Sequence, residues 1–241
     1  MAKRTITDKV QYQGMPTLEV LEEAANYNSW IASQISSHVT PPVLEIGSGT
    51  GNLTKYFLTN RPLHITDKDS GLVNHLKQRY STEKNIAVSM LDVSQKPTKN
   101  MLNRYSSAFA INVLEHIDED VLALKNICKM LKKNGKLLLL VPAKKFAYTK
   151  LDKELGHYRR YEKYELEEKL KESGFVIEKI YFFNIVGLLS WTVRNKVKKN
   201  NVHLKPYHIK LFDSIVPLLR IMESFIKIPI GISLIVIAKK I

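Results

Sequence analysis

The sequence predicts an α/β fold built on a doubly wound, mostly parallel sheet with helices on both faces. Three observations support this prediction. Short apolar segments of strand length alternate with longer segments of helix-like apolar spacing. A glycine-rich loop follows the first apolar segment. The segment 137–141 is an uninterrupted apolar run, as expected for a strand that is covered on both faces.

Seven strands are expected along the chain. Five of them alternate with helices, and two follow later. The expected strands are 42–46, 63–67, 86–90, 106–111, 136–141, 176–183 and 232–238. Helices are expected at 72–80 and 118–131, and Asn134 and Gly135 provide the stop signal for the second.

The loop after the first strand carries the clearest sign of ligand binding. Gly47, Gly49 and Gly51 follow the strand, and the next segment, 52–57, can begin a helix. Glycines let the backbone approach a ligand where a Cβ atom would collide. The start of a helix offers unpaired N–H groups and a partial positive charge. A small charged ligand is therefore expected at the carboxyl end of this strand.

The glycine pattern distinguishes two cofactors. A dinucleotide loop follows G-x-G-x-x-G, but Asn52 occupies the position of the last glycine. The observed G-x-G-x-G, preceded by Glu45, resembles motif I of the class I S-adenosylmethionine-dependent methyltransferases. The resemblance implies that Glu45 attracts the ammonium of the cofactor, directly or through water, while loop N–H groups bind its carboxylate. The alternative is a tight strand-to-helix turn without a ligand.

Acids after the second and third strands extend the resemblance. The second motif of the family places Asp67 on the ribose hydroxyls and Asp69 nearer the next helix. The alternative is that both acids merely cap that helix. After the third strand, the resemblance implies that Asp92 accepts the adenine amino group, with the backbone of Val93 beside it. The alternative for Asp92 is a plain loop acid.

The segment after the fourth strand, which reads Asn-Val-Leu-Glu-His-Ile, resembles the corresponding motif of small-molecule methyltransferases. The resemblance implies that Asn112 and Val113 lie beside the methionine part of the cofactor. It also implies that His116 points towards the methyl group and the acceptor. A lone histidine before a helix is otherwise a cap or a solvated side chain.

The resemblance covers residues 17–182 and predicts a single domain, 1–241, with a Rossmann-like methyltransferase fold. In this family the last of seven strands lies antiparallel between the fifth and the sixth. Residues 1–40 are expected to form an N-terminal helical cap. Its helix, 18–35, folds over the cofactor in similar proteins, which makes Tyr27 a predicted cofactor contact.

The loop after the fifth strand is rich in groups that could bind an acceptor, because it contains the sequence Gly-His-Tyr-Arg-Arg-Tyr. His157 is a candidate general base, since the unperturbed pKa of histidine is about 6.5. Arg159 and Arg160 are expected to clamp a phosphate or carboxylate, with Tyr158 and Tyr161 beside them. The alternative is that the arginines pair with Asp152, Glu154 or Glu162 and only brace the loop.

This loop and the apolar, basic tail together look like a bacterial methyltransferase group. Its domain is sometimes found beside, or fused to, glycosyltransferases that act on lipid-linked sugars. Residues 184–231 are expected to insert two helices before the last strand, although Gly187 and Pro217 disfavour unbroken helices. Apolar faces bordered by lysines are typical of a helix at a membrane interface or of a lid over an apolar substrate. The alternatives are packing on the sheet edge and a homodimer contact.

Composition bounds the setting of the chain. Hydrophobic residues make up 44% of 241 residues, enough for a sizeable core, and the single cysteine, Cys128, allows no internal disulfide. The net charge is +14. The segment from Leu189 to the last residue contains ten Lys or Arg and only two acids. Such basicity suits phosphate on nucleic acid or lipid headgroups. No signal peptide or membrane span is expected, so the predicted location is the cytoplasm, with peripheral contact at the inner membrane face through 184–231.

The motifs together predict methyl transfer from S-adenosylmethionine to an oxygen or nitrogen of a small or lipid-linked acceptor, releasing S-adenosylhomocysteine. His116 and His157 are the predicted bases, and no metal site is predicted. An RNA methyltransferase is a rival that the charge favours. Against it, no RNA-binding module is visible, and 112–115 reads Asn-Val-Leu-Glu rather than an Asn/Asp-Pro-Pro-Tyr/Phe motif. Other rivals are a non-catalytic membrane-surface protein and a nicotinamide-dependent reductase.

Overall fold

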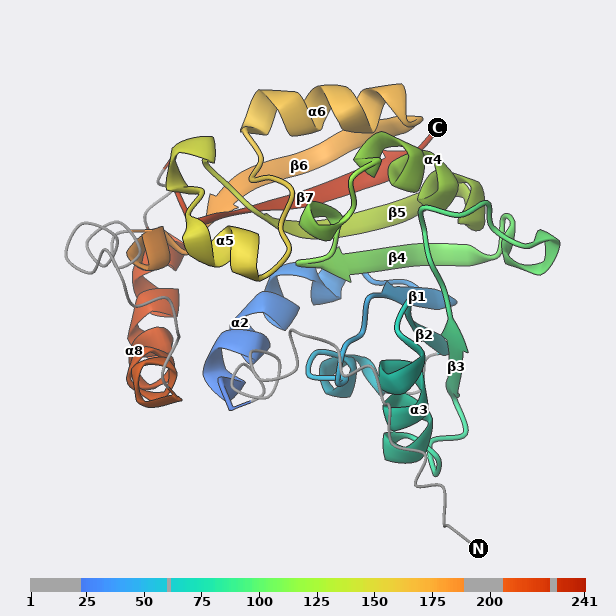
Figure 1. Ribbon diagram of the computed structural model, residues 1–241, viewed down its shortest axis with the longest axis horizontal. Coiled ribbons are helices and arrows are strands. Elements are labelled where there is room, and N and C mark those ends of the chain that lie inside the picture. The colour runs from blue at the N-terminus through green and yellow to red at the C-terminus, as the bar shows by residue number, and fades with distance from the viewer. Residues whose placement is uncertain (1–22, 60–61, 189–205, 226–228) are drawn as a thin grey trace, which may run out of the picture.

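The computed structural model describes residues 23–59, 62–188, 206–225 and 229–241. Its strands form one seven-stranded sheet in the order β3-β2-β1-β4-β5-β7-β6 (Figure 1). The strands are β1 Val43–Ile46, β2 Leu63–Asp67, β3 Ile86–Met90, β4 Tyr105–Ile111, β5 Leu131–Pro142, β6 Phe175–Phe183 and β7 Ser233–Lys240. The α-helices of the described residues include α2 Ala25–Ile35, α3 Ser70–Arg79, α4 Asp120–Met130, α5 Lys150–Glu154, α6 Lys163–Glu172 and α8 Pro206–Phe225.

The sheet topology confirms the predicted fold class. Strands β1 to β5 are parallel, and β7 runs antiparallel to both of its neighbours, β5 and β6. The strand order reverses between β1 and β4. In open α/β sheets, ligands bind at the carboxyl ends of the strands beside such a switch point. The fold therefore directs attention to the loops after β1 and β4.

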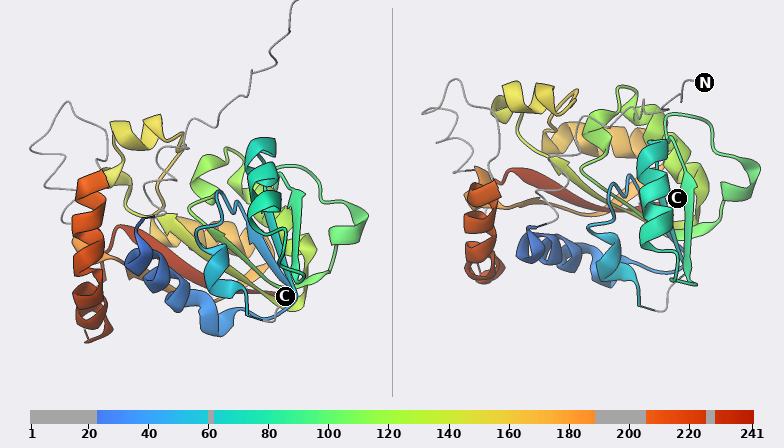
Figure 2. Two further views of the ribbon diagram at one scale, coloured as in Figure 1. Left: turned by 90° about the horizontal axis from the view of Figure 1, so that it is seen from below. Right: turned by 60° about the horizontal axis from the view of Figure 1, so that its bottom comes forward.

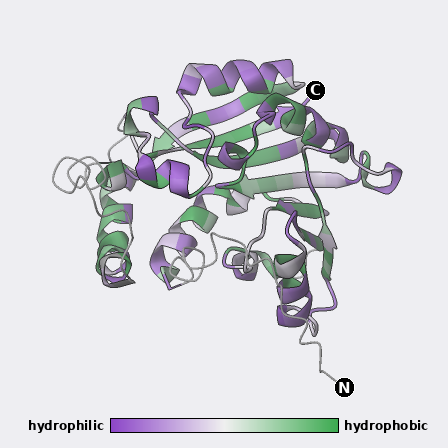
Figure 3. Cartoon of the chain, in the orientation of Figure 1, coloured by the Kyte–Doolittle hydropathy of each residue, from purple (hydrophilic) through white to green (hydrophobic). Residues whose placement is uncertain are grey.

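The apolar run in β5 is buried because both faces of the sheet are covered. Leu137 and Leu139 belong to a core shared with α4 and α6. Leu138 and Leu140 alternate with them and belong to a second core shared with α2 and α8. Figure 3 shows the strands mainly in the colours of apolar residues and much of α6 in those of polar residues. Because successive side chains of a strand point to opposite faces of the sheet, this one apolar segment contributes to both cores.

Two predicted helices differ from the observed elements. The segment after the glycine loop forms a short 3-10 helix, Thr54–Phe57, instead of opening an α-helix. The Thr54 hydroxyl donates to Glu45 in β1, at 2.8 Å, and this bond holds the turn close to the strand. The helix predicted to extend to 131 ends at Met130, because Leu131 is fully buried in extended conformation and pairs with Tyr105.

The insertion before β7 contributes the long helix α8, which continues through Pro217 although proline was expected to interrupt it. Residues 185–188 are also helical, whereas the rest of the first predicted helix lies outside the described residues. The start of the predicted helix at 18 also lies outside them, and α2 begins at Ala25. Among the helices of the described ranges, none is both long and apolar enough to cross a membrane.

Helices α2 and α8 lie side by side at the end of the sheet (Figure 2). Val216 and Leu219 of α8 are buried in the same core as residues of α2. The N-cap residue of α2, Ala24, has no side chain that could accept a hydrogen bond. Asp213 of α8 supplies the missing acceptor, since its carboxylate receives the N–H groups of Asn26 and Tyr27 at 3.2 and 2.8 Å.

We expect Asp213→Ala to lower the free energy of unfolding by about 1–2 kcal/mol, because the first turn of α2 loses its capping carboxylate. Urea unfolding followed by circular dichroism measures the change. Ser214→Ala is the matched control, since the Ser214 side chain is exposed and bonds only within α8. Equal stability of the two variants would contradict this account of how α8 is held.

Candidate active site

The glycine loop after β1 has a backbone that only glycine adopts readily. Gly47, Gly49 and Gly51 all have positive φ angles, of 68°, 58° and 86°. A Cβ atom on Gly47 would lie 2.5 Å from a methyl carbon of Val113. The loop after β1 therefore abuts the loop after β4, so predicted site residues from these two segments lie next to each other.

Glu45 is a buried acid beneath this loop. It is 3% exposed, and the only hydrogen bond described for its carboxyl group comes from the Thr54 hydroxyl, at 2.8 Å. Burial raises the pKa of Glu45 to about 8, and the negative charge of Asp67 adds to the increase. A cation bound beside Glu45 would favour its ionised form. This environment fits the predicted contact with an ammonium group.

The structure gives the two acids after β2 different roles. Asp69 caps α3, since its carboxylate accepts the N–H of Leu72 at 2.9 Å. Asp67 is mostly buried, and its carboxylate receives the N–H of Gly49 at 2.9 Å and that of Asp69 at 3.0 Å. Burial raises the pKa of Asp67, although these bonds oppose the increase. Asp67 is therefore the acid that adjoins the glycine loop, and ribose binding by Asp67 stays a prediction.

Asp92 and Val93 follow β3 and lie in different environments. Asp92 is exposed, and one of its oxygens accepts both the N–H and the hydroxyl of Ser94, at 2.9 and 2.6 Å. Val93 is buried, and its carbonyl accepts the side-chain amide of Asn126 at 3.0 Å. The second oxygen of Asp92 has no hydrogen bond described for it. Adenine binding by these two residues stays a prediction.

Asn112 and Val113 begin the loop after β4. Asn112 is exposed, has a positive φ of 54°, and donates its N–H to the carbonyl of Leu140 at 2.8 Å. Val113 is half-buried and packs against Gly47. Val113 therefore borders the glycine loop and Asn112 directly precedes it, and their contact with the methionine part of the cofactor stays a prediction.

Tyr27 lies in an aromatic contact between α2, β6 and α8. Its ring centroid is 6.3 Å from Trp30, 6.2 Å from Phe183 and 5.6 Å from Phe212. Its hydroxyl accepts the side-chain amide of Asn184 at 3.3 Å. These contacts give Tyr27 a packing role, and its contact with the cofactor stays a prediction.

The two candidate bases are in contact. His116 lies in the short 3-10 helix after β4, Leu114–His116, and His157 lies in the loop after α5. Their ring centroids are 4.6 Å apart, with the rings nearly perpendicular. Burial lowers the pKa of His116 to about 4, and the nearby charges of His157 and Lys68 contribute. His116 is therefore a neutral imidazole at physiological pH.

Asp152 orients the second imidazole. Its carboxylate lies 3.0 Å from His157 Nδ1 and accepts the Arg160 Nε–H at 2.8 Å. Burial alone would raise the pKa of Asp152, but the hydrogen bonds from His157 and Arg160 outweigh it and lower the pKa. Asp152 is therefore an ionised acceptor beside Nδ1 of His157, and Nε2 is the ring nitrogen that lies outside this bond.

Glu115 was not singled out from the sequence as a site residue. Its side chain is fully buried next to both histidines, and neither carboxylate oxygen has a hydrogen-bond partner among the described residues. Burial raises the pKa of Glu115 to about 8. The sequence signal was present, because Glu115 directly precedes His116, but the sequence gave no indication that this acid would be buried.

The structure corrects the expected phosphate clamp. Arg160 is buried and pairs with Asp152, as the bracing alternative proposes. Arg159 pairs with Asp118 and Asp120, at 3.1 and 3.0 Å, and these are not the acids first considered. Both guanidinium groups are thus engaged within the protein and do not form an open pair.

The two tyrosines of the same loop differ in exposure. Tyr161 is buried, and its hydroxyl donates to Asp120 at 2.9 Å. That contact makes Tyr161 a core residue rather than part of a substrate surface. Tyr158 is 57% exposed and remains the residue of the Tyr-Arg-Arg-Tyr run best placed to contact an acceptor.

Comparison with known proteins matches this architecture. Residues 44–137 match the family model described as "Methyltransferase domain". A non-reducing polyketide synthase from Penicillium brasilianum is 30% identical over 124 residues, which are 48% of this chain and 5% of that protein. An uncharacterized methyltransferase from Schizosaccharomyces pombe is 32% identical over 124 residues, which are 46% of this chain and 43% of that protein. The chain therefore spans less than half the length of each relative.

A solved structure shares the fold. The trans-methyltransferase CalH in complex with SAH has a TM-score of 0.59 and 18% sequence identity, covering 92% of this chain and 59% of that one. The family match and this neighbour agree with the methyltransferase-like fold, and that neighbour was solved with SAH bound.

We expect the binding of S-adenosylhomocysteine, which shares the ammonium of the cofactor, to strengthen as the pH rises from 6.0 to 7.5. Glu45, with a pKa of about 8, is protonated in the free protein and must release its proton to pair with the ammonium. Release of one proton gives about a tenfold gain in affinity per pH unit. Calorimetry in buffers of different ionisation enthalpy measures both the affinity and the proton count.

Glu45→Gln is the matched variant for this measurement, because it keeps the shape of the side chain and replaces the ionisable carboxyl group with a neutral amide. The pH dependence is expected to be lost with this substitution. A pH-independent affinity in the unmodified protein, or the same slope in Glu45→Gln, would rule out the assigned role of Glu45.

Proposed function

We propose that the chain is a class I S-adenosylmethionine-dependent methyltransferase that methylates an oxygen or nitrogen of a small or lipid-linked acceptor. One observation carries the proposal. The contact between Gly47 and Val113 brings the glycine loop after β1 against the segment that ends in His116. The groups that bind the donor and the groups that face the acceptor are therefore neighbours.

The protein's first contribution is alignment. When bound, S-adenosylmethionine supplies a methyl group whose bond to sulfur breaks as the bond to the acceptor forms, which leaves S-adenosylhomocysteine. Glu45, Asp67 and the glycine loop hold the donor, and the histidine pair borders the acceptor. Holding two reactants in line can lower a barrier by about 7–11 kcal/mol.

The second contribution is removal of the acceptor proton. His157 is the better-arranged base, because Asp152 holds Nδ1 and leaves Nε2 outside this hydrogen bond. His116, with a pKa of about 4, is a weak proton acceptor and lines the site as a neutral ring. General base catalysis of this kind contributes about 10²–10⁴-fold for a hydroxyl acceptor, whereas a neutral amine needs less help.

We infer a lipid-borne acceptor from the outer surface of α8. Leu211, Ile215, Leu218 and Met222 follow helical spacing and are all exposed, and Figure 3 shows apolar colours along the visible side of α8. The basic residue Lys210 stands beside this stripe and is exposed. Apolar stripes flanked by basic residues suit the interface of an anionic membrane.

Methyl transfer is tested with isotope-labelled donor and fractionated extract of cells. We expect label in the lipid or small-molecule fraction, and His157→Ala to reduce the rate by about 10²–10⁴-fold for a hydroxyl acceptor. Binding of S-adenosylhomocysteine should be unchanged in this variant. His75→Ala, an exposed substitution on α3, is the control and should retain the full rate.

The distribution of label also decides between rival functions. Label in RNA would replace the proposal with an RNA methyltransferase. An intact cofactor site with no transfer to any fraction would indicate a non-catalytic protein that retains the fold.

Membrane contact is tested by flotation with vesicles. We expect binding to phosphatidylglycerol vesicles, little binding to phosphatidylcholine vesicles, and loss of binding in Leu211→Ser/Leu218→Ser/Met222→Ser. Leu122→Ser, which removes an exposed leucine from α4, is the control. Failure to float with anionic vesicles, or a stripe-dependent dimer in analytical ultracentrifugation, would assign the stripe of α8 to another partner.

A further inference from the structure

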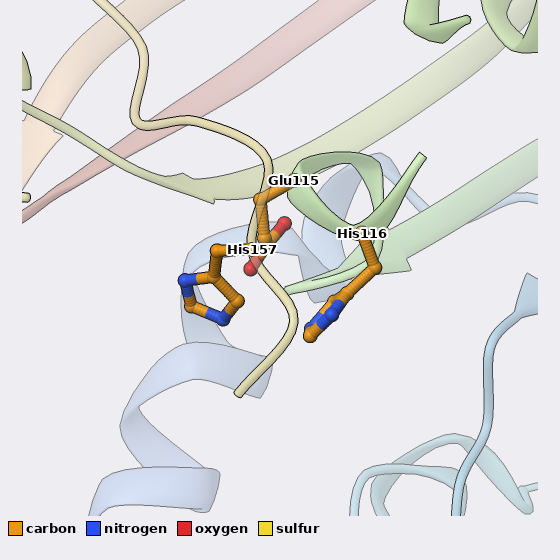
Figure 4. A group of neighbouring side chains, drawn as sticks. All are labelled: Glu115, His116 and His157. Atoms are coloured by element: carbon orange, nitrogen blue, oxygen red, sulfur yellow. The ribbon is translucent and has the colours of Figure 1, made fainter. Parts of the chain in front are cut away.

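Three side chains that could bind a metal lie close together where the turn after β4 meets the loop after α5. One ligand atom from each of Glu115, His116 and His157 lies within 4.8 Å of the other two. Figure 4 shows the carboxylate of Glu115 close to the two imidazole rings. Two of these residues come from the turn after β4 and the third from the loop after α5, so the fold rather than local sequence assembles the group.

The buried state of Glu115 is not explained by the protein's own contacts. Its side chain is fully buried, and both carboxylate oxygens lack a hydrogen-bond partner among the described residues. Buried carboxylates are normally paired, hydrogen-bonded or bound to a metal. The nearby charges of Arg160 and Asp152 oppose one another, because the first stabilises a negative charge on Glu115 and the second disfavours it.

The histidines are held as metal ligands usually are. Asp152 accepts the Nδ1–H of His157 at 3.0 Å, which fixes the ring and leaves Nε2 as the donor atom. Histidine ligands commonly donate their second N–H to a carboxylate in this way. The backbone of Gly156 lies beside the His116 ring and favours a proton on it.

We propose that Glu115, His116 and His157 bind one divalent transition-metal ion, with Zn²⁺ as the best-fitting ion. Two neutral imidazoles and one carboxylate are a common donor set for zinc at sites that keep an open position. Zinc bonds of about 2.0–2.1 Å would require the three side chains to close by roughly 1–1.5 Å. The Glu115 carboxylate, which has no hydrogen-bond partner among the described residues, is the ligand best able to make this movement.

The use of such an ion rests on the proposed function. An acceptor hydroxyl in the open position would lose its proton to solvent more readily. Its oxygen would then form the bond to the methyl carbon as the carbon–sulfur bond breaks. Under this proposal both histidines serve as ligands, and the ion takes over the role assigned above to His157 as a base.

The test measures metal binding without cofactor or acceptor. The full chain, stripped by dialysis against chelator, is titrated with Zn²⁺ by calorimetry and with Co²⁺ by visible absorption. We expect one saturable equivalent per chain. Glu115→Gln and His116→Gln should each weaken Zn²⁺ binding more than tenfold, and Asp152→Asn, which alters only the support of His157, should weaken it by about 10–100-fold.

Controls separate this proposal from folding and from the proposed function. His75→Gln removes an exposed histidine from α3 and should bind Zn²⁺ as the unmodified chain does. Circular dichroism and S-adenosylhomocysteine binding verify that each variant is folded. Absence of a saturable equivalent, unchanged affinity in both ligand variants, or equal weakening in His75→Gln would overturn the proposal. Zinc binding in a chain that fails to bind S-adenosylhomocysteine would leave the metal site standing and overturn the proposed function.

Discussion

The contact between Gly47 and Val113 is the constraint on which the rest of the site depends. Because Gly47 has no Cβ, the loop after β1 can approach the loop after β4 more closely than any other residue would allow. The parallel pairing of β1 with β4 sets the height of both loops above the sheet. Donor-binding and acceptor-facing groups are therefore fixed relative to each other by backbone packing rather than by flexible side chains.

Buried acids are the second common feature of this edge of the sheet. Glu45, Asp67 and Glu115 are all mostly or fully buried, and burial raises the pKa of each. Such groups reduce the stability of the folded protein at neutral pH, since the unfolded chain would let them ionise in water. A cation bound beside such an acid favours its ionised form and offsets this loss of stability. In the proposed binding mode the ammonium of the cofactor would meet this condition at Glu45, and the inferred metal ion would meet it at Glu115.

Much of the fold could be predicted from the sequence, because strand burial leaves a strong local pattern. The limits of β2 and β3 agree with the predicted ranges, and the antiparallel placement of the last strand followed from the family resemblance. The boundary at Leu131 could not be predicted from helix periodicity, since it depends on pairing with Tyr105 from a distant part of the chain. The helical state of Pro217 likewise depends on packing of α8 against α2.

The sequence indicated which residues gather around the glycine loop, and it was less informative about the loop after β5. Motif spacing pointed to Glu45 and Asp67, whereas burial and pairing decide what Arg160 and Glu115 can do. Whether an arginine clamps a ligand or braces a loop depends on which carboxylate the fold places beside it. The buried Asp152 beside Arg160 favours bracing, and this information is absent from a single sequence.

Asp152 shows how that bracing supports chemistry without touching a substrate. Its carboxylate accepts hydrogen bonds from the backbone N–H of Thr149 at the start of α5 and from the Arg160 guanidinium. It also contacts Nδ1 of the His157 ring. The helix start, the imidazole and the buried cation are thus tied to one anion. Arg160 keeps that anion ionised, and the ionised anion keeps His157 protonated on Nδ1. The orientation of Nε2 towards the site therefore follows from an ion pair in the protein interior, whether that nitrogen accepts a proton or binds a metal.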